Sequence, residues 1–250
     1  HCSYFQIIIM SLHGIKLITF DVTNTLLRFR IPPYDYYASV ARCHGFKGTG
    51  VDLKNQLHIS YKDLSKQHPN FGKNSISWNN WWSRVIELTF QGRLPTEKIN
   101  EISQQLIEDF KTPTCWKVAD GGTDLIRLLK KFGIIVGVIS NFDPRLHDIL
   151  TNMKIHSCFD FILTSYEVGV CKPDKKIFEC AQDYYGNNIS SQQCLHIGDD
   201  LENDYNGAKA VGWHALLITN KSIKLPYSKN VYPSLQDLCK AIESDKLKLS

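Results

Sequence analysis

The sequence lacks several features that would assign it to a class at once. No apolar run approaches the ~20 residues that span a bilayer, and the Lys and Arg residues are scattered through the chain instead of forming a basic arm. The net charge is only +4. These absences argue against a membrane or a nucleic acid as the partner of this protein.

The eight cysteines also lack a pattern. They contain no Cys-x-x-Cys pair and no regular spacing, so neither a zinc site nor a disulfide framework is expected. Free thiols suit a reducing compartment; the expected location is the cytoplasm, with other reducing compartments as alternatives. Residues 1–9 are expected to be a leader, either added to the native chain or disordered, with Met10 as the native start.

The hydrophobic pattern divides the chain into two kinds of region. Outside residues 31–112, short apolar and β-branched runs alternate with helical patterns, which indicates right-handed βαβ units. Strands are expected at residues 15–20, 134–139, 159–163, 194–197 and 215–218, and helices at residues 123–131, 144–153, 175–185 and 204–211. The predicted fold class is therefore α/β, with a doubly wound, mostly parallel Rossmann-like sheet.

Residues 31–112 follow a different pattern. Apolar residues such as Ile99 and Ile102 recur at helical spacing, and no convincing strand interrupts them. We therefore predict an α/β core made of residues 11–30 and 113–250 and an inserted all-α cap domain at residues 31–112.

Aromatic side chains of the insert have two interpretations. Trp78, Trp81 and Trp82 either contact a substrate or pack the helical module onto itself. Packing is the interpretation that we favour, because large aromatic side chains dominate protein cores. No substrate contact is therefore assigned to the cap.

Four short polar segments stand at or after the predicted ends of strands. They are Asp21–Thr25, Ser140–Asn141, Lys172–Pro173 and Gly198–Asp204. In open α/β sheets, ligands bind beyond the carboxyl ends of the strands. Four such signals at one edge of the sheet predict a single site there.

The segments carry a family resemblance. The stretches of sequence around them that carry the resemblance are Phe20–Leu26, Val138–Asp143, Lys172–Phe178 and Gly198–Gly212. With them the chain resembles, over residues 15–220, the haloacid dehalogenase superfamily of aspartate-nucleophile hydrolases, and within it a eukaryotic branch. The resemblance implies a C1-type α-helical cap inserted between the first and second motifs. It also implies a phosphatase-type hydrolase that acts on a small phosphorylated metabolite.

The resemblance implies a role for each matching residue. Asp21 would be the nucleophile that forms a phosphoryl-enzyme. Ser140 and Asn141 would bind the phosphoryl oxygens, and Lys172 would supply a positive charge to that group and to Asp21. Ser140 and Lys172 are thus catalytic candidates as well as phosphate-binding ones.

The same resemblance implies a Mg²⁺ site. The carboxylates of Asp21 and Asp199 and the backbone carbonyl of Thr23 would be its ligands, because this hard cation prefers oxygen. Asp204 would support the metal site by orienting a bound water or neighbouring groups. Asp200 would either join that support or cap the helix that contains Asp204.

Thr23 is where the sequence departs from the family's phosphatases. They carry a second Asp two residues after the nucleophile, which acts as general acid and base, and a neutral hydroxyl at this position is a poor replacement. Losing such a group typically costs ~10² to 10⁴ in rate. In the same loop, Thr25 is expected to hydrogen-bond locally and Asn24 to adopt an unusual φ angle.

Three functions are open at this point. The first is a Mg²⁺-dependent phosphohydrolase of low or narrow activity on a small phosphorylated metabolite. The second is a catalytically depleted member that binds a phosphorylated ligand or a protein. The third, haloacid dehalogenation, needs no second Asp, but the acidic fourth segment argues for a metal site that dehalogenases do not use.

Overall fold

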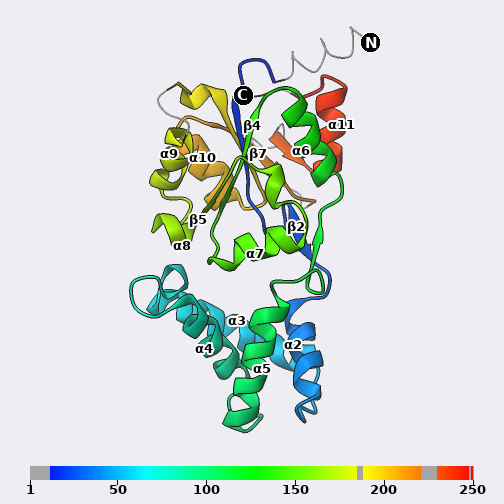
Figure 1. The fold of residues 1–250 in the computed structure, drawn as a ribbon, viewed down its shortest axis with the longest axis vertical. Helices are drawn as coiled ribbons and strands as arrows, with labels where there is room; N and C mark the ends of the chain where they lie inside the picture. The colour runs from blue at the N-terminus through cyan, green and yellow to red at the C-terminus, as the bar shows by residue number, and fades with distance from the viewer. Residues whose placement is uncertain (1–11, 185–187, 221–229, 248, 250) are drawn as a thin grey trace. The chain divides into compact units, whose positions relative to one another are not determined.

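A computed structural model describes residues 12–184, 188–220, 230–247 and 249 (Figure 1). The proposed leader, residues 1–9, lies outside the described residues. The chain forms two compact units. The α/β unit comprises the described residues up to Arg28 together with Val118–Asn141 and Ile155–Ser250, and the helical unit comprises Phe29–Lys117 and Phe142–Lys154.

The α/β unit is built on a six-stranded sheet in the order β5-β4-β1-β6-β7-β8, and all neighbouring strands are parallel. The strands are β1 (Leu17–Phe20), β4 (Ile135–Ser140), β5 (Phe161–Thr164), β6 (Cys194–Gly198), β7 (His214–Ile218) and β8 (Val231–Tyr232). Each residue of β1 is buried, as expected for a central strand covered on both faces. The predicted doubly wound α/β class is confirmed.

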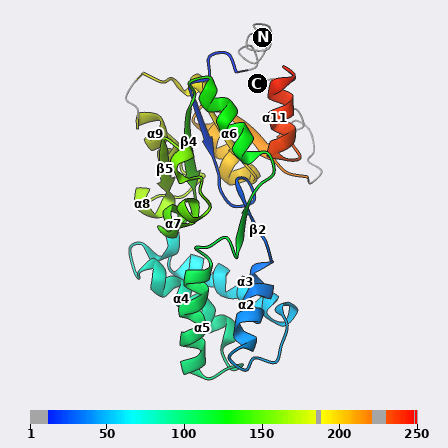
Figure 2. The ribbon, with the colours of Figure 1, turned by 45° about the vertical axis from the view of Figure 1, so that its right-hand side comes forward.

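Helices cover the two faces of this sheet. Figure 1 shows α6 and α11 together on one side and α9 and α10 on the other, and Figure 2 shows the same separation of α9 from α6 and α11. The helices and helical turns of the unit are α6 (Gly122–Lys131), η2 (His156–Cys158), α8 (Ser165–Val168), α9 (Lys175–Asp183), η3 (Ser191–Gln193), η4 (Leu201–Asn206), α10 (Gly207–Ala210) and α11 (Leu235–Glu243). Their apolar faces pack on the strands, and Phe178 and Trp213 are fully buried in the resulting core.

The helical unit contains α2 (Pro33–Arg42), α3 (Gly50–Gln67), η1 (Asn70–Gly72), α4 (Trp78–Phe90), α5 (Thr96–Asp109) and α7 (Arg145–Asn152). Its core is formed by apolar side chains from α2, α3, α4 and α5. Trp81 is 1% exposed and makes edge contacts with the rings of Tyr61 and Phe71. Packing is therefore the role of Trp81, whereas Trp78 and Trp82 are half-buried.

Two short strands mark where the chain passes from one unit to the other. β2 (Leu27–Phe29) and β3 (Trp116–Val118) form a separate two-stranded sheet. Within the helical unit, Arg30 Nε donates to the carbonyls of Pro113 and Trp116 at 2.7 and 2.9 Å. The two ends of the helical insert are thereby joined through main-chain and side-chain hydrogen bonds.

Residues 142–154 belong to the helical unit, although sequence analysis assigned them to the α/β core. The physical reason is a buried ion pair at their start. The guanidinium of Arg145 binds the carboxylate of Asp143 and lies over the rings of Trp78 and Trp82 in α4. This contact attaches α7 to the other helices of its unit.

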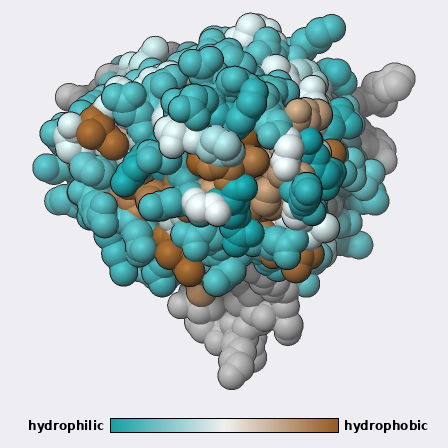
Figure 3. Space-filling view, turned by 90° about the horizontal axis from the view of Figure 1, so that it is seen from below, coloured by the Kyte–Doolittle hydropathy of each residue, from teal (hydrophilic) through white to brown (hydrophobic). Residues whose placement is uncertain are grey.

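Figure 3 shows one face of the molecule, which is mostly hydrophilic and carries several apolar areas among the hydrophilic residues. In the part of the chain that the structure describes, no helix has the length and apolar character needed to cross a membrane. All the cysteines in that part are free thiols, as the sequence predicted.

Candidate active site

The predicted site lies at the topological switch point of the sheet. β1 pairs with β4 on one side and with β6 on the other. Asp21 follows β1, Ser140 is the last residue of β4, and Asp199 follows β6. Ligands of open α/β sheets bind in the crevice at such a point. The sheet therefore brings three of the predicted residues to one edge.

The carboxylate of Asp21 receives donors from distant parts of the chain. Its Oδ1 accepts hydrogen bonds from Lys172 Nζ at 2.7 Å and from Ser140 Oγ at 3.1 Å. Burial raises the pKa of Asp21 to about 6; the Lys172 ammonium opposes this shift and the Asp204 carboxylate adds to it. Asp21 is thus a buried carboxylate in a defined orientation, which suits a nucleophile.

Lys172 is the centre of the site's hydrogen bonding. Its Nζ donates to Asp21 Oδ1 at 2.7 Å, to Asp204 Oδ1 at 2.5 Å and to the carbonyl of Ile139 at 2.8 Å. These three acceptors match the three protons of an ammonium group. Burial lowers the pKa of Lys172, but the two carboxylates outweigh it and the net shift is upward. Lys172 is therefore charged and fixed in place.

Asn141 orients Lys172. The backbone N–H of Lys172 donates to Asn141 Oδ1 at 2.7 Å, and Asn141 Nδ2 donates to the Lys172 carbonyl at 2.9 Å. Sequence analysis assigned the Asn141 side chain to phosphate binding, together with Ser140 and Lys172. In the structure both ends of its carboxamide are bonded to the Lys172 backbone, and of these three residues Ser140 and Lys172 have side chains that hydrogen-bond to Asp21.

Three carboxylates converge at the same edge. Asp21, Asp199 and Asp204 each offer an oxygen, and these oxygens all lie within 4.8 Å of one another. Burial raises the pKa of Asp199 to about 7, and the neighbouring carboxylates add to the shift. Asn24 Nδ2 donates to Asp199 Oδ2 at 3.3 Å. Asp21 and Asp199 thus resist ionisation, chiefly through burial and further through the neighbouring carboxylates. A hard divalent cation at this all-oxygen set would offset both effects.

Asp204 differs from the other two carboxylates because its oxygens are fully bonded. Oδ1 meets Lys172 Nζ and His196 Nε2, and Oδ2 accepts the backbone N–H of Asp200 at 3.0 Å. Burial favours its neutral form, but Lys172 and His196 hold the pKa of Asp204 well below its usual range. Asp204 is therefore a buried anion directed at Lys172.

The backbone of Gly198 makes room for Asp204. A Cβ atom at this position would lie 2.2 Å from Asp204 Cγ, so only glycine permits the approach. Sequence analysis did not predict this role, nor did it identify His196. A histidine inside the apolar run of β6 is the signal that could have drawn attention to it.

Asp200 caps the helical turn η4. Its Oδ1 accepts the backbone N–H groups of Glu202 and Asn203 at 3.0 and 2.7 Å. This is the second of the two roles that the sequence suggested for Asp200, and it uses the side chain at the helix N-terminus.

The loop after Asp21 follows the sequence expectation in part. Asn24 has a φ of 62°, the unusual angle that was expected there. Thr23 is half-buried. The hydroxyl of Thr25 is buried without a hydrogen-bond partner among the described residues, so the local side-chain bond expected for it is not formed. Its backbone N–H bonds to the Val22 carbonyl at 3.2 Å.

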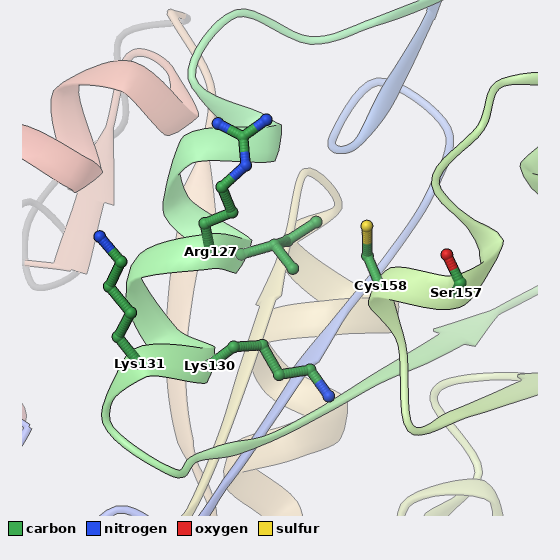
Figure 4. A pocket seen from close by; sticks show the side chains of 6 residues that line it. Arg127, Lys130, Lys131, Ser157 and Cys158 are labelled. Atoms are coloured by element: carbon green, nitrogen blue, oxygen red, sulfur yellow. The ribbon is translucent and has the colours of Figure 1, made fainter.

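A pocket elsewhere on the α/β unit does not compete with this site. It has a volume of about 550 Å³ and lies between α6 and η2. Figure 4 shows the side chains of Arg127, Lys130 and Lys131 pointing in different directions. Arg127 and Lys130 are also paired with Asp124 and Asp160. The positive charges therefore do not converge on a ligand.

Comparison with known proteins shows which family has this sequence pattern. The haloacid dehalogenase-like hydrolase family profile matches residues 15–212, which include every element of the site. This chain belongs to the haloacid dehalogenase-like hydrolase family. It is therefore a member of a family of hydrolases, and the resemblance expected from its four segments is confirmed.

Two curated relatives are similar over most of this haloacid dehalogenase-like chain. The rhythmically expressed gene 2 protein of Drosophila melanogaster is 38% identical, covering 93% of this chain and 96% of the relative. The haloacid dehalogenase-like hydrolase domain-containing protein 3 of Bos taurus is 36% identical, covering 88% of each. Both are eukaryotic, as the sequence resemblance predicted.

Solved structures share the fold of this family member. The HAD-hydrolase YfnB of Bacillus subtilis, described as bound to magnesium, has a TM-score of 0.66 at 18% identity, covering 91% of this chain and 98% of its own. A HAD phosphatase from Thermococcus onnurineus has a TM-score of 0.62 at 19% identity, covering the same shares. At these identities the likeness supports the fold alone.

Proposed function

We propose that this protein is a Mg²⁺-dependent phosphohydrolase that uses Asp21 as its nucleophile on a small phosphorylated metabolite. The observation that carries the proposal is the bond of Lys172 Nζ to Asp21 Oδ1 at 2.7 Å, at the switch point of the sheet. A buried carboxylate beside a fixed ammonium suits nucleophilic attack on an anionic group, because the cation offsets the charge repulsion.

In the proposed reaction, a carboxylate oxygen of Asp21 attacks phosphorus while the bond from phosphorus to the leaving oxygen breaks. The leaving group departs with the bonding electrons, and water then attacks phosphorus to release phosphate and restore Asp21. Ser140 and Lys172 stabilise the charge on the phosphoryl oxygens. Asp21, Asp199 and the Thr23 carbonyl would hold Mg²⁺, which would neutralise carboxylate and phosphoryl charge.

Thr23 restricts the substrates of the proposed reaction. With no carboxyl group at this position, the departing oxygen receives no proton from it, so substrates with acidic leaving groups should react best. Acyl and aryl phosphates meet this requirement, whereas alkyl phosphates carry the penalty of ~10² to 10⁴ for a missing general acid. The low or narrow activity expected from the sequence follows from this single position.

The test compares the wild type with three variants on acyl, aryl and alkyl phosphates, with and without Mg²⁺. Asp21→Asn should abolish phosphate release, and Thr23→Asp should raise activity most on alkyl phosphates. Asp124→Asn is the matched control, since Asp124 is exposed on α6 and should leave the rates unchanged. Metal-independent release that survives Asp21→Asn would overturn the proposal.

A second candidate function is retained because of Thr23. Without a proton shuttle, the same site could bind a phosphorylated ligand or a protein and turn nothing over. It predicts that inorganic phosphate with Mg²⁺ stabilises the protein against unfolding while no substrate in the panel is hydrolysed. Robust turnover of any phosphate ester would exclude it.

A further inference from the structure

A pair of buried polar side chains lies behind the proposed site. Thr19 in β1 and His196 in β6 are directly paired in the register of the two strands. Thr19 Oγ1 lies 2.8 Å from His196 Nδ1, and His196 Nε2 lies 3.1 Å from Asp204 Oδ1. Both side chains are 0% exposed. Two polar groups at the centre of an apolar sheet are costly unless their hydrogen bonds are made.

The hydrogen-bond partners determine the form of the imidazole. The carboxylate of Asp204 is acceptor-only, so the contact at Nε2 requires a proton on that nitrogen. In a neutral imidazole Nδ1 is then an acceptor, and the hydroxyl of Thr19 donates to it. The assigned state is therefore the Nε2–H tautomer, held by Thr19 on one side and Asp204 on the other.

The ring of His196 is also held by packing. The fully buried Phe178 ring lies edge-on to the imidazole, with centroids 5.3 Å apart. The acceptor of the imidazole N–H is held as well, because the missing Cβ of Gly198 lets Asp204 approach β6. The imidazole N–H is thus aimed at Asp204 by both hydrogen bonding and shape.

We propose that Thr19 and His196 are positioning residues, which hold Asp204 and through it the Lys172 ammonium against Asp21. Asp204 Oδ1 is the shared atom, since it accepts from both His196 Nε2 and Lys172 Nζ. Without the imidazole donor, this carboxylate can rotate and the ammonium loses a fixed counter-charge. The kinetic part of this inference rests on the proposed function of the site, because Lys172 affects a rate only where a phosphoryl group reacts.

The kinetic test uses the wild type, His196→Leu, His196→Gln and Thr19→Val on an aryl phosphate with Mg²⁺. His196→Leu should lower kcat by about 10- to 100-fold, the usual effect of removing a partner that orients a site residue. KM should change little, because Lys172 acts mainly on charge in the transition state. His196→Gln should recover most of the loss, since its amide can donate to Asp204.

Thr89→Val is the matched control for Thr19→Val. Thr89 is equally buried, and its hydroxyl bonds to the Val85 carbonyl within α4 of the helical unit. Both variants exchange a hydroxyl for a methyl group in a β-branched side chain. Only Thr19→Val should lower kcat, whereas a general loss of stability would affect the two alike.

A second measurement is independent of turnover. In ¹⁵N NMR spectra of the metal-free protein, His196 should show a protonated Nε2 and an unprotonated Nδ1. The Lys172 ammonium protons should be protected from exchange in the wild type and in His196→Gln, and should exchange rapidly in His196→Leu.

The outcomes separate the two proposals. If the wild type hydrolyses no phosphate ester but the NMR pattern is found, the proposed function fails and the positioning role of His196 stands. A protonated Nδ1, or a folded His196→Leu variant with wild-type kcat and protected Lys172 protons, would overturn the positioning role. If His196→Leu does not fold, Thr19→Val and the wild-type spectrum decide. A folded Thr19→Val variant with wild-type kcat, or a protonated Nδ1 in wild-type His196, would also overturn the positioning role.

Discussion

Each unit of the protein buries a cluster of charged side chains, and the two clusters differ in charge balance. In the helical unit, the Asp143 carboxylate faces the Arg145 guanidinium, with bonds of 2.9 Å from Nε and 2.8 Å from Nη2. The Arg145 backbone N–H and Trp82 Nε1 supply two further donors at 3.0 and 2.7 Å. One carboxylate there has four donors and one counter-charge.

In the α/β unit, three carboxylates share one ammonium. Lys172 is bonded to Asp21 and Asp204, which leaves Asp199 with a single hydrogen bond of 3.3 Å from Asn24 among the described residues. Burial raises the pKa of Asp199 to about 7, and the neighbouring carboxylates, which lack a matching positive charge, add to the shift. The difference teaches that a buried cluster with balanced charges supports the fold. A buried cluster with excess negative charge indicates where a ligand of positive charge belongs.

The largest expected effect comes from breaking the balanced cluster. Arg145→Met should lower the free energy of unfolding by about 3–5 kcal/mol, because it leaves the Asp143 charge buried and unpaired. The double variant Asp143→Leu with Arg145→Met should recover most of this loss, since no charge is then buried. Urea unfolding monitored by Trp fluorescence measures both. A single variant as stable as the wild type would contradict the comparison.

The unbalanced cluster should respond in the opposite direction. Asp199→Asn removes a carboxylate that its surroundings disfavour, so the metal-free protein should become more stable by about 0.5–2 kcal/mol. The same change should abolish the stabilisation by Mg²⁺. Thermal unfolding with and without Mg²⁺ tests both statements, and Asp124→Asn provides the control. Destabilisation of the metal-free variant would show that Asp199 has a partner that supports the fold.

The pH dependence of stability sharpens the same contrast by a smaller amount. Asp21 and Asp199 have an ordinary pKa of 3.8, raised on folding to about 6 and about 7. Between these values the folded state binds more protons, so the free energy of unfolding of the metal-free protein should fall as pH rises from about 4 to 7. Asp204 and His196 act oppositely, because their pKa values are lowered on folding. The contribution of Asp204 is lost only at lower pH, and that of His196 offsets part of the fall expected from the two raised carboxyl groups. Unfolding at about pH 5 and pH 7.5 checks the sign; an increase would contradict it.

The smallest expected effect concerns one donor of the balanced cluster. Trp82→Phe retains the aromatic face under Arg145 but removes the hydrogen bond from Nε1 to Asp143, at a cost of about 0.5–1 kcal/mol. Because the Arg145 bonds remain, phosphate release should not change. Urea unfolding and the aryl phosphate assay measure the two readouts. A loss of several kcal/mol would mean that the ring has a larger role than this bond.

Sequence patterns predicted the elements that a strong local signal defines. The run ending at Phe20 predicted a strand at residues 15–20, and β1 spans Leu17–Phe20. Elements that were missed include the short β2, β3 and β8, whose two or three residues are too few to show alternation, the single-turn helix α8, and α11, which lies after the region of resemblance. The helix expected at residues 204–211 begins earlier, as the π-helical turn η4 at Leu201, because Asp200 caps it there.

The candidate site was predictable to the level of its motifs. Asp21, Ser140, Lys172 and Asp199 were recognisable because each stands after a buried strand or in a motif of fixed composition. The bonds of Asn141 to Lys172 and the cradle that Gly198 provides for Asp204 were not, since they depend on the distance between segments in space. The assignment of residues 142–154 to the helical unit depends on Arg145 packing, which no local pattern indicates.

The sequence by itself determined the fold class, the family and the edge of the sheet where the site lies. It did so because apolar periodicity and the order of polar segments are local properties of the chain. Only the tertiary structure decided which carboxylates are neutralised, and that Thr19 meets His196 across 177 positions of sequence. The physical reason is that burial, charge balance and hydrogen-bond direction are set by neighbours in space, which strand pairing and helix packing select.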